Sequence, residues 1–84
     1  MSGLRVRYWA AARDAAQLES ETVEATTLAG VLEAVRMRHD ERFATVLGAS
    51  SLLLDGVAVG RRDPEEVEVA DGMTLEVLPP FAGG

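Results

Sequence analysis

The sequence predicts one α+β domain, a mixed β-sheet with one principal helix packed across it. Alternating apolar and polar residues mark short strands near both ends of the chain. Between them, apolar residues recur at i, i+3, i+4 and i+7, which is the spacing of one helix face: Leu28, Val31, Leu32 and Val35. A length of 84 residues allows one sheet and one or two helices around a single core.

Five short strands are expected, each bounded by turn residues or by a change to helical spacing. In chain order they span residues 4–9, 20–25, 51–54, 57–59 and 73–78. In the first strand, Leu4, Val6 and Tyr8 should face the core. The second strand is polar and suits a sheet edge. Asp55-Gly56 is a strong hairpin dipeptide between the third and fourth strands.

The principal helix should follow the second strand. Thr27 is its expected N-cap, and the helix should end near His39. A short second helix is expected around Phe43, Val46 and Leu47, ending at Gly48. Residues 10–18 have helical composition but weak periodicity, so we expect a connection with about one helical turn there. The expected order is therefore β-β-α-(α)-β-β-β.

Composition excludes several classes of function. The net charge of −6 argues against a nucleic acid partner, which needs clustered basic residues. Cysteine is absent and His39 is the single histidine, so thiolate and multi-histidine metal sites are excluded. No apolar stretch reaches the ~18 residues needed to cross a bilayer, and no secretory signal is seen, so a cytoplasmic protein without membrane contact is expected.

The most informative segment is the C-terminal tail, defined here as residues 79–84, which follows a domain predicted to span residues 1–78. Its residues are Pro79, Pro80, Phe81, Ala82, Gly83 and Gly84. The prolines favour an extended path, and six residues reach at most roughly 20 Å. Since glycine has no side chain, Gly83 and Gly84 can enter a narrow channel and leave the terminal carbonyl accessible. We therefore expect the Gly84 carboxylate to be the reactive group.

Two further residues predict a partner-binding surface. Trp9 follows the inward-facing Tyr8 and should lie on the outer face of the sheet with Arg5 and Arg7, and Leu78 falls on the polar side of the last strand. If the first and last strands are neighbours, Trp9 and Leu78 form one apolar patch, which Phe81 would extend.

Both ends of the chain carry motifs of a known family. Tyr8-Trp9-Ala10-Ala11-Ala12-Arg13-Asp14 is similar to an aromatic-aromatic-Ala-x-x-Arg-Glu segment, and the ending Pro79-Pro80-Phe81-Ala82-Gly83-Gly84 is similar to Pro-Pro-x-x-Gly-Gly. On these motifs the chain resembles the ubiquitin-like sulfur carriers of the MoaD/ThiS family, specifically the small subunit of molybdopterin synthase (MoaD type). The resemblance implies a β-grasp (ubiquitin-like) fold in which the first and last strands lie side by side in parallel.

The resemblance also implies a function and partners. An E1-like adenylyltransferase (MoeB type) would use ATP and Mg to adenylate Gly84, and a sulfur donor protein would convert the adenylate to a thiocarboxylate. The tail would then enter the large synthase subunit (MoaE type), which adds the sulfur to precursor Z, also called cyclic pyranopterin monophosphate, in molybdenum cofactor biosynthesis. The chain itself would bind no cofactor and carry sulfur as a non-catalytic subunit.

Other readings of the same tail stay open. Carriers with a Gly-Gly end also serve thiazole synthesis, tRNA thiolation and cysteine synthesis. A ubiquitin-like protein modifier would instead join the Gly84 carboxyl to an amine of another protein, because this chain contains eight arginines and no lysine. A plain β-grasp interaction module would leave the tail inert.

Overall fold

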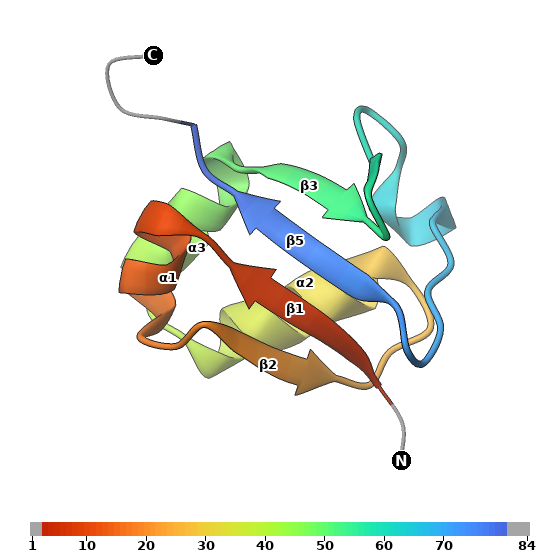
Figure 1. Ribbon diagram of the computed structural model, residues 1–84, viewed down its shortest axis with the longest axis horizontal. Coiled ribbons are helices and arrows are strands. Elements are labelled where there is room, and N and C mark those ends of the chain that lie inside the picture. Colours follow the sequence, from red (N-terminus) through yellow and green to blue (C-terminus); the bar gives the residue numbers. More distant parts are fainter. Residues whose placement is uncertain (1–2, 81–84) are drawn as a thin grey trace.

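Five strands form one mixed sheet in the computed structural model, which describes residues 3–80 (Figure 1). The strands are β1 Leu4–Tyr8, β2 Ser20–Val23, β3 Ser51–Leu54, β4 Val57–Ala58 and β5 Thr74–Leu78. The helices are α1 Ala10–Ala16, α2 Leu28–Arg38, α3 Glu41–Ala49 and the short 3₁₀ helix η1 Pro64–Glu66. The spatial order of the strands is β2-β1-β5-β3-β4, which confirms the predicted α+β class and puts the polar second strand at an edge.

The first and last strands lie side by side in the middle of the sheet. β1 and β5 pair in parallel, with Tyr8 opposite Val77. β5 also pairs antiparallel with β3, and β1 pairs antiparallel with β2. The parallel neighbourhood of the first and last strands, which the resemblance implied, is therefore present.

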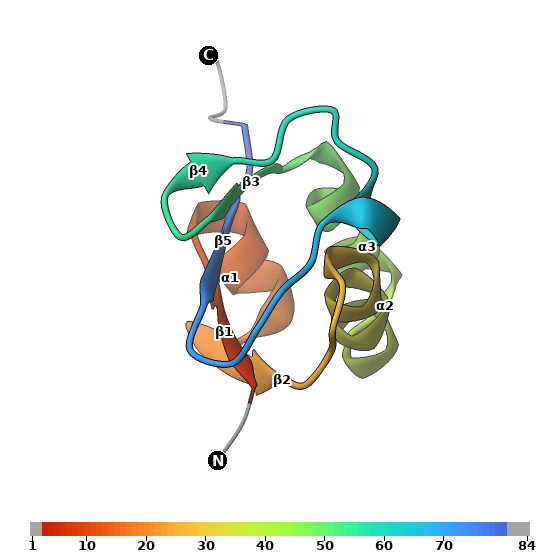
Figure 2. The ribbon, with the colours of Figure 1, turned by 90° about the vertical axis from the view of Figure 1, so that its right-hand side faces the viewer.

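The helices lie on one side of the sheet and enclose the core. Viewed along the sheet, α2 and α3 lie on the same side of the strands, and the opposite sheet face carries no helix in the part of the chain described (Figure 2). The core takes alternate residues of β1 and β5 together with the predicted stripe of α2, which is buried at Leu28, Val31, Leu32 and Val35. Phe43 of α3 is also completely buried, as the periodicity predicted.

The helix cap at Thr27 and the turn at Asp55-Gly56 are both present, as the sequence predicted. The side chain of Thr27 accepts a hydrogen bond from the backbone N–H of Gly30 at 3.1 Å and so caps α2. Asp55 and Gly56 both have positive φ, 50° and 83°, which gives the β3–β4 hairpin the twist that strands require. Asp55 also accepts a hydrogen bond from the backbone N–H of Thr74 at 2.8 Å, so the hairpin is tied to β5.

Residues 10–18 differ from the expectation of a single helical turn. They form helix α1, which runs from Ala10 to Ala16 and buries Ala12, Ala15 and Ala16. Alanine is the best helix former but contributes little apolar surface, so an alanine face is a weak periodic signal. Val67 and Val69 are buried outside the five strands, and their segment makes one isolated bridge, between Glu68 and Thr27.

Within residues 3–80, none of the helices combines the length and the apolar character that a membrane span requires.

Candidate functional site

The sheet face opposite the helices presents one row of residues across four strands. Cross-strand register aligns Arg7 of β1 with Glu76 of β5, Glu76 with Leu53 of β3, and Leu53 with Ala58 of β4. Directly opposed residues share a sheet face, so this row runs across the surface that no described helix covers. We call this surface the open face.

Trp9 lies on the open face beside the row. Its backbone N–H donates to the carbonyl of Val77 at 3.2 Å, which extends the β1–β5 pairing by one residue. Its indole Nε1 donates to Oε1 of Glu76 at 3.0 Å, and the guanidinium carbon of Arg7 lies 4.9 Å from the ring centroid. Trp9 is 38% exposed, so its indole is available for contact, while Glu76 and Arg7 define the position of the ring.

Leu78 and the prolines mark where the tail leaves the domain. Leu78 is half-buried and lies opposite Ser51 of β3. Pro79 is buried and Pro80 is exposed. Since Tyr8 pairs with Val77, the next residues along the two parallel strands are Trp9 and Leu78. The structure thus brings together these two residues of the predicted patch at the base of the tail.

The remaining predicted site residues lie outside the described residues. They are Phe81, Ala82, Gly83 and Gly84, so the reactive carboxylate, the extension of the patch by Phe81 and the domain boundary after residue 78 stay predictions.

A hollow of about 270 Å³ lies between the start of β3 and the residues that follow β4, and Ser51 in its lining pairs with Leu78 at the tail base. It is lined by Ser50, Ser51, Leu52, Leu53, Ala58, Val59 and Gly60. None of these side chains is an acid, a base or a thiol, so the hollow offers surface for contact and no group for proton transfer. Residues 3–80 also contain no cluster of three or more side chains suited to hold a metal ion.

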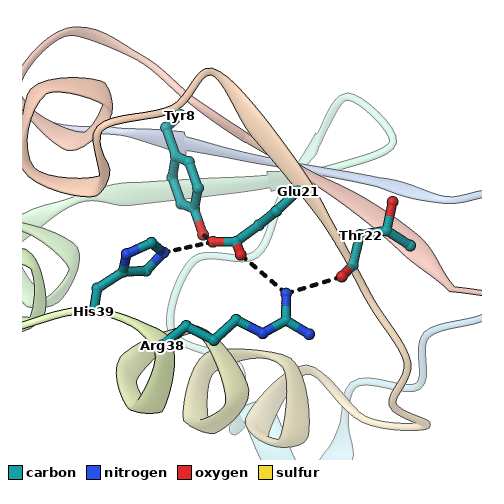
Figure 3. Close-up of polar contacts among 5 residues, drawn as sticks. All are labelled: Tyr8, Glu21, Thr22, Arg38 and His39. Carbon is teal, nitrogen blue, oxygen red and sulfur yellow. Dashed lines mark hydrogen bonds and ion pairs between the residues drawn. The ribbon is translucent and has the colours of Figure 1, made fainter.

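A partly buried polar cluster lies beside the core, where Tyr8 of β1, Glu21 of β2 and the end of α2 meet (Figure 3). The Tyr8 hydroxyl donates to Oε2 of Glu21 at 2.5 Å, and Nε2 of His39 lies 2.7 Å from the same oxygen. Nη1 of Arg38 donates to Oε1 of Glu21 at 2.9 Å and to the carbonyl of Thr22 at 3.0 Å. We call Tyr8, Glu21, Arg38 and His39 the Glu21 cluster.

The Glu21 cluster has the electrostatics of a structural brace. Burial disfavours the charged form of Glu21, but the hydrogen bonds from Tyr8, His39 and Arg38 outweigh it and hold the pKa of this carboxyl below its ordinary value. Burial, followed by the hydrogen bond to Glu21 and its negative charge, raises the pKa of the Tyr8 hydroxyl well above its usual range. A carboxylate fixed by three donors and a phenol held neutral cannot act readily as acid or base near neutral pH.

Sequence reasoning missed this cluster. The available signal was alternation: Glu21 precedes the buried Val23 by two residues, so both side chains face inward from β2. A tyrosine placed in the core also requires a partner for its hydroxyl, and Glu21 meets that need.

The comparison with family models decides the relationship. The model described as the ThiS family matches residues 6–84, nearly the whole chain. This chain belongs to the ThiS family. The family comprises ubiquitin-like sulfur carriers of the MoaD/ThiS kind, which agrees with the resemblance seen in the sequence. No curated protein matches the sequence.

Solved structures confirm the β-grasp fold. Small archaeal modifier protein 1 from Methanosarcina acetivorans is 18% identical, with a TM-score of 0.82 over 100% of this chain and 98% of that one. A chain of the complex of subunits 1 and 2 of molybdopterin-converting factor from Helicobacter pylori is 22% identical, with a TM-score of 0.68 over 96% of this chain and 97% of that one. A chain of the BexX/CysO complex from Amycolatopsis orientalis is 24% identical, with a TM-score of 0.78 over 96% and 99%.

Proposed function

We propose that this chain is the sulfur-carrying small subunit of a molybdopterin synthase. Gly84 would be adenylated, converted to a thiocarboxylate, and used to transfer sulfur to precursor Z on the large subunit (MoaE type). The observation that carries the proposal is the parallel pairing of β1 and β5, which puts Trp9 and Leu78 at the point where the Pro-Pro-x-x-Gly-Gly tail leaves the sheet.

The chemistry of the tail suits each step. An α-carboxylate is ionised at neutral pH and can attack the α-phosphorus of ATP when Mg²⁺ and cationic side chains of an E1-like enzyme (MoeB type) neutralise the phosphates; pyrophosphate then leaves. A persulfide sulfur of the donor protein attacks the acyl-adenylate and displaces AMP. A second thiol then attacks the donor's inner sulfur, which forms a disulfide with the donor and leaves the thiocarboxylate on Gly84. Because the two terminal residues are glycines, no side chain hinders attack at the carbonyl.

The role assigned to this chain is that of a protein cosubstrate. The described groups nearest the tail base are the apolar Trp9, Leu78 and Pro79, together with the charged pair Arg7 and Glu76 on the sheet face. None of these forms the nucleophile-base pair that acyl transfer requires. We therefore assign catalysis to the activating enzyme and to the large subunit.

The partner-binding surface would be the open face at the tail base. An exposed tryptophan at the ladder position next to a half-buried leucine, with a hollow lined in part by the Ser51 that pairs with Leu78, is the kind of surface that anchors a protein partner. The molybdopterin-converting factor of Helicobacter pylori and CysO of Amycolatopsis orientalis are both solved as complexes with another protein, which supports a protein partner for this chain.

The pathway is tested by sulfur transfer with purified components. The thiocarboxylated chain is incubated with a molybdopterin synthase large subunit and precursor Z, and the dithiolene product is measured. We expect one sulfur to leave this chain for each sulfur gained by the pterin, and we expect no product from a chain that lacks Gly84.

Three other outcomes would redirect the assignment. Sulfur transfer to a thiazole, tRNA or cysteine-forming system, with none to precursor Z, would keep the carrier chemistry and move the chain to another branch. Recovery of the chain joined to lysines of other proteins, with no thiocarboxylate formed, would favour a protein modifier. An unchanged function after deletion of Gly84 would indicate an inert tail.

A further inference from the structure

The indole of Trp9 is held by two charged neighbours of opposite sign. Arg7 and Glu76 face each other across the parallel β1–β5 pair, two residues before Trp9 and Leu78 in the ladder. The Trp9 side chain must turn back along the sheet to reach them, because its Nε1 is 3.0 Å from Oε1 of Glu76 and its ring centroid is 4.9 Å from the guanidinium carbon of Arg7. The hydrogen bond restrains the edge of the indole, and the cation restrains its face.

Glutamate is an uncommon residue at position 76, in the middle of a central strand. β5 is the central strand of the sheet, and glutamate is less favourable in strands than β-branched or aromatic residues. Its neighbours in the row are Arg7 on one side and the half-buried Leu53 on the other. A carboxylate here adds little to the packing of the open face, but it provides a strong acceptor for the indole N–H.

We propose that Glu76 is a positioning residue that fixes the indole of Trp9 as a preformed anchor for the large subunit beside the tail. This inference rests on the proposed function for the identity of the partner. A partner that binds a mobile indole must order it, and ordering one side chain lowers affinity by a factor of about two to ten. In this chain the acceptor on β5 orders the indole before the partner arrives, so the partner meets an anchor that is already in place at the tail base.

The first test measures the indole in the free protein. Trp9 is the single tryptophan of the chain, so time-resolved fluorescence anisotropy reports on this side chain alone. We expect E76A to increase the amplitude of fast local motion, E76Q to retain the wild-type value because its amide oxygen still accepts, and R7A to produce a smaller increase. An unchanged anisotropy decay in E76A would overturn the positioning role.

The second test measures affinity for the large subunit by titration calorimetry. We expect E76A to weaken binding about threefold to tenfold and E76Q to stay within about twofold of the wild type. The matched control is E33A, which removes one carboxylate from the exposed surface of α2, on the helical side of the sheet. Denaturation midpoints of all variants show whether β5 has been weakened instead.

The two tests separate this inference from the proposed function. If no variant and no wild-type chain binds the large subunit, the proposed partner is wrong, and the anisotropy result alone decides whether Glu76 positions Trp9. If the wild type binds and E76A binds equally well despite a mobile indole, the docking role of Glu76 is wrong although the partner is right.

Discussion

At the scale of single residues, Glu21 joins three elements through one carboxylate. Tyr8 comes from β1, Arg38 from the end of α2, and His39 directly follows that helix. The side chains of Glu21 and His39 are 13% and 11% exposed, so water can replace these hydrogen bonds poorly if one partner is removed. The cluster therefore stabilises the contact between the edge strand and α2.

Lowering the pH should remove the contribution of Glu21 to the free energy of unfolding. Its pKa is lower in the folded protein than in the unfolded chain, so its stabilisation is complete above the unfolded pKa and is lost as the pH falls through the folded pKa. We expect the free energy of unfolding, measured with urea, to decline below about pH 4.5. E21Q should lower it by about 1–2 kcal/mol at pH 7 and reduce this acid-dependent decline.

Glu19 offers a matched control, since it is an exposed glutamate two residues earlier. E19Q should leave both the stability at pH 7 and the acid-dependent decline close to wild type. An equal response of E19Q and E21Q would show that the Glu21 cluster is not the source of the effect.

Raising the pH should lower the stability of the fold through the ionisation of Tyr8. Because burial and Glu21 raise the pKa of its hydroxyl, the folded state keeps Tyr8 neutral while the unfolded chain ionises it. The contribution is complete below the unfolded pKa of about 10 and is lost as the pH rises beyond it. Chemical denaturation between pH 8 and about pH 11 should show falling stability for the wild type and a flatter profile for Y8F. A fall of equal steepness in Y8F would contradict this origin.

At the scale of elements, α2 depends on a capping residue that the sequence identified correctly. Thr27 has extended backbone angles, and its hydroxyl satisfies the N–H of Gly30, which the helix leaves without a partner. T27A should lower the free energy of unfolding by about 1 kcal/mol. T26A is the matched control, since the neighbouring Thr26 is exposed and precedes the cap. Equal losses in T26A and T27A, measured by urea denaturation, would argue against capping.

Elements with a strong local pattern could be predicted from the sequence, whereas those that depend on tertiary contacts could not. The stripe of α2 and the Asp55-Gly56 turn follow from spacing and backbone preference, which act within a few residues. Helix α1 packs small alanines against the sheet, and its hydrophobic signal is weak for that reason. The Glu21 cluster depends on residues up to 31 positions apart, from Tyr8 to His39, so no local window reveals it.

The candidate site also has one feature that could be predicted and one that could not. Trp9 and Leu78 are separated by most of the chain, and their adjacency was expected from the family resemblance before the parallel pairing of β1 and β5 confirmed it. The contact of the indole with Glu76 could not be predicted, because alternation assigns a side chain to a face but does not give its direction along that face.

At the scale of the whole molecule, the stabilising contacts and the proposed binding surface lie on opposite faces of the sheet. The core and the Glu21 cluster lie on the helical side of the sheet, and the open face and the tail base lie where no described helix covers the strands. Changes in the last residues should therefore leave the domain intact. A chain that ends at Gly83 should show the denaturation midpoint of the full chain while losing its ability to carry sulfur.

The central claim is that the terminal carboxylate of this chain is activated and loaded with sulfur. The most direct measurement is the intact mass of the chain after incubation with an activating enzyme of the MoeB type, ATP, Mg²⁺ and a sulfur source. We expect the mass to increase by the difference between one sulfur and one oxygen, and we expect no increase in the chain that ends at Gly83. An unchanged mass in the full chain, with an enzyme proven active on its own carrier, would contradict the account.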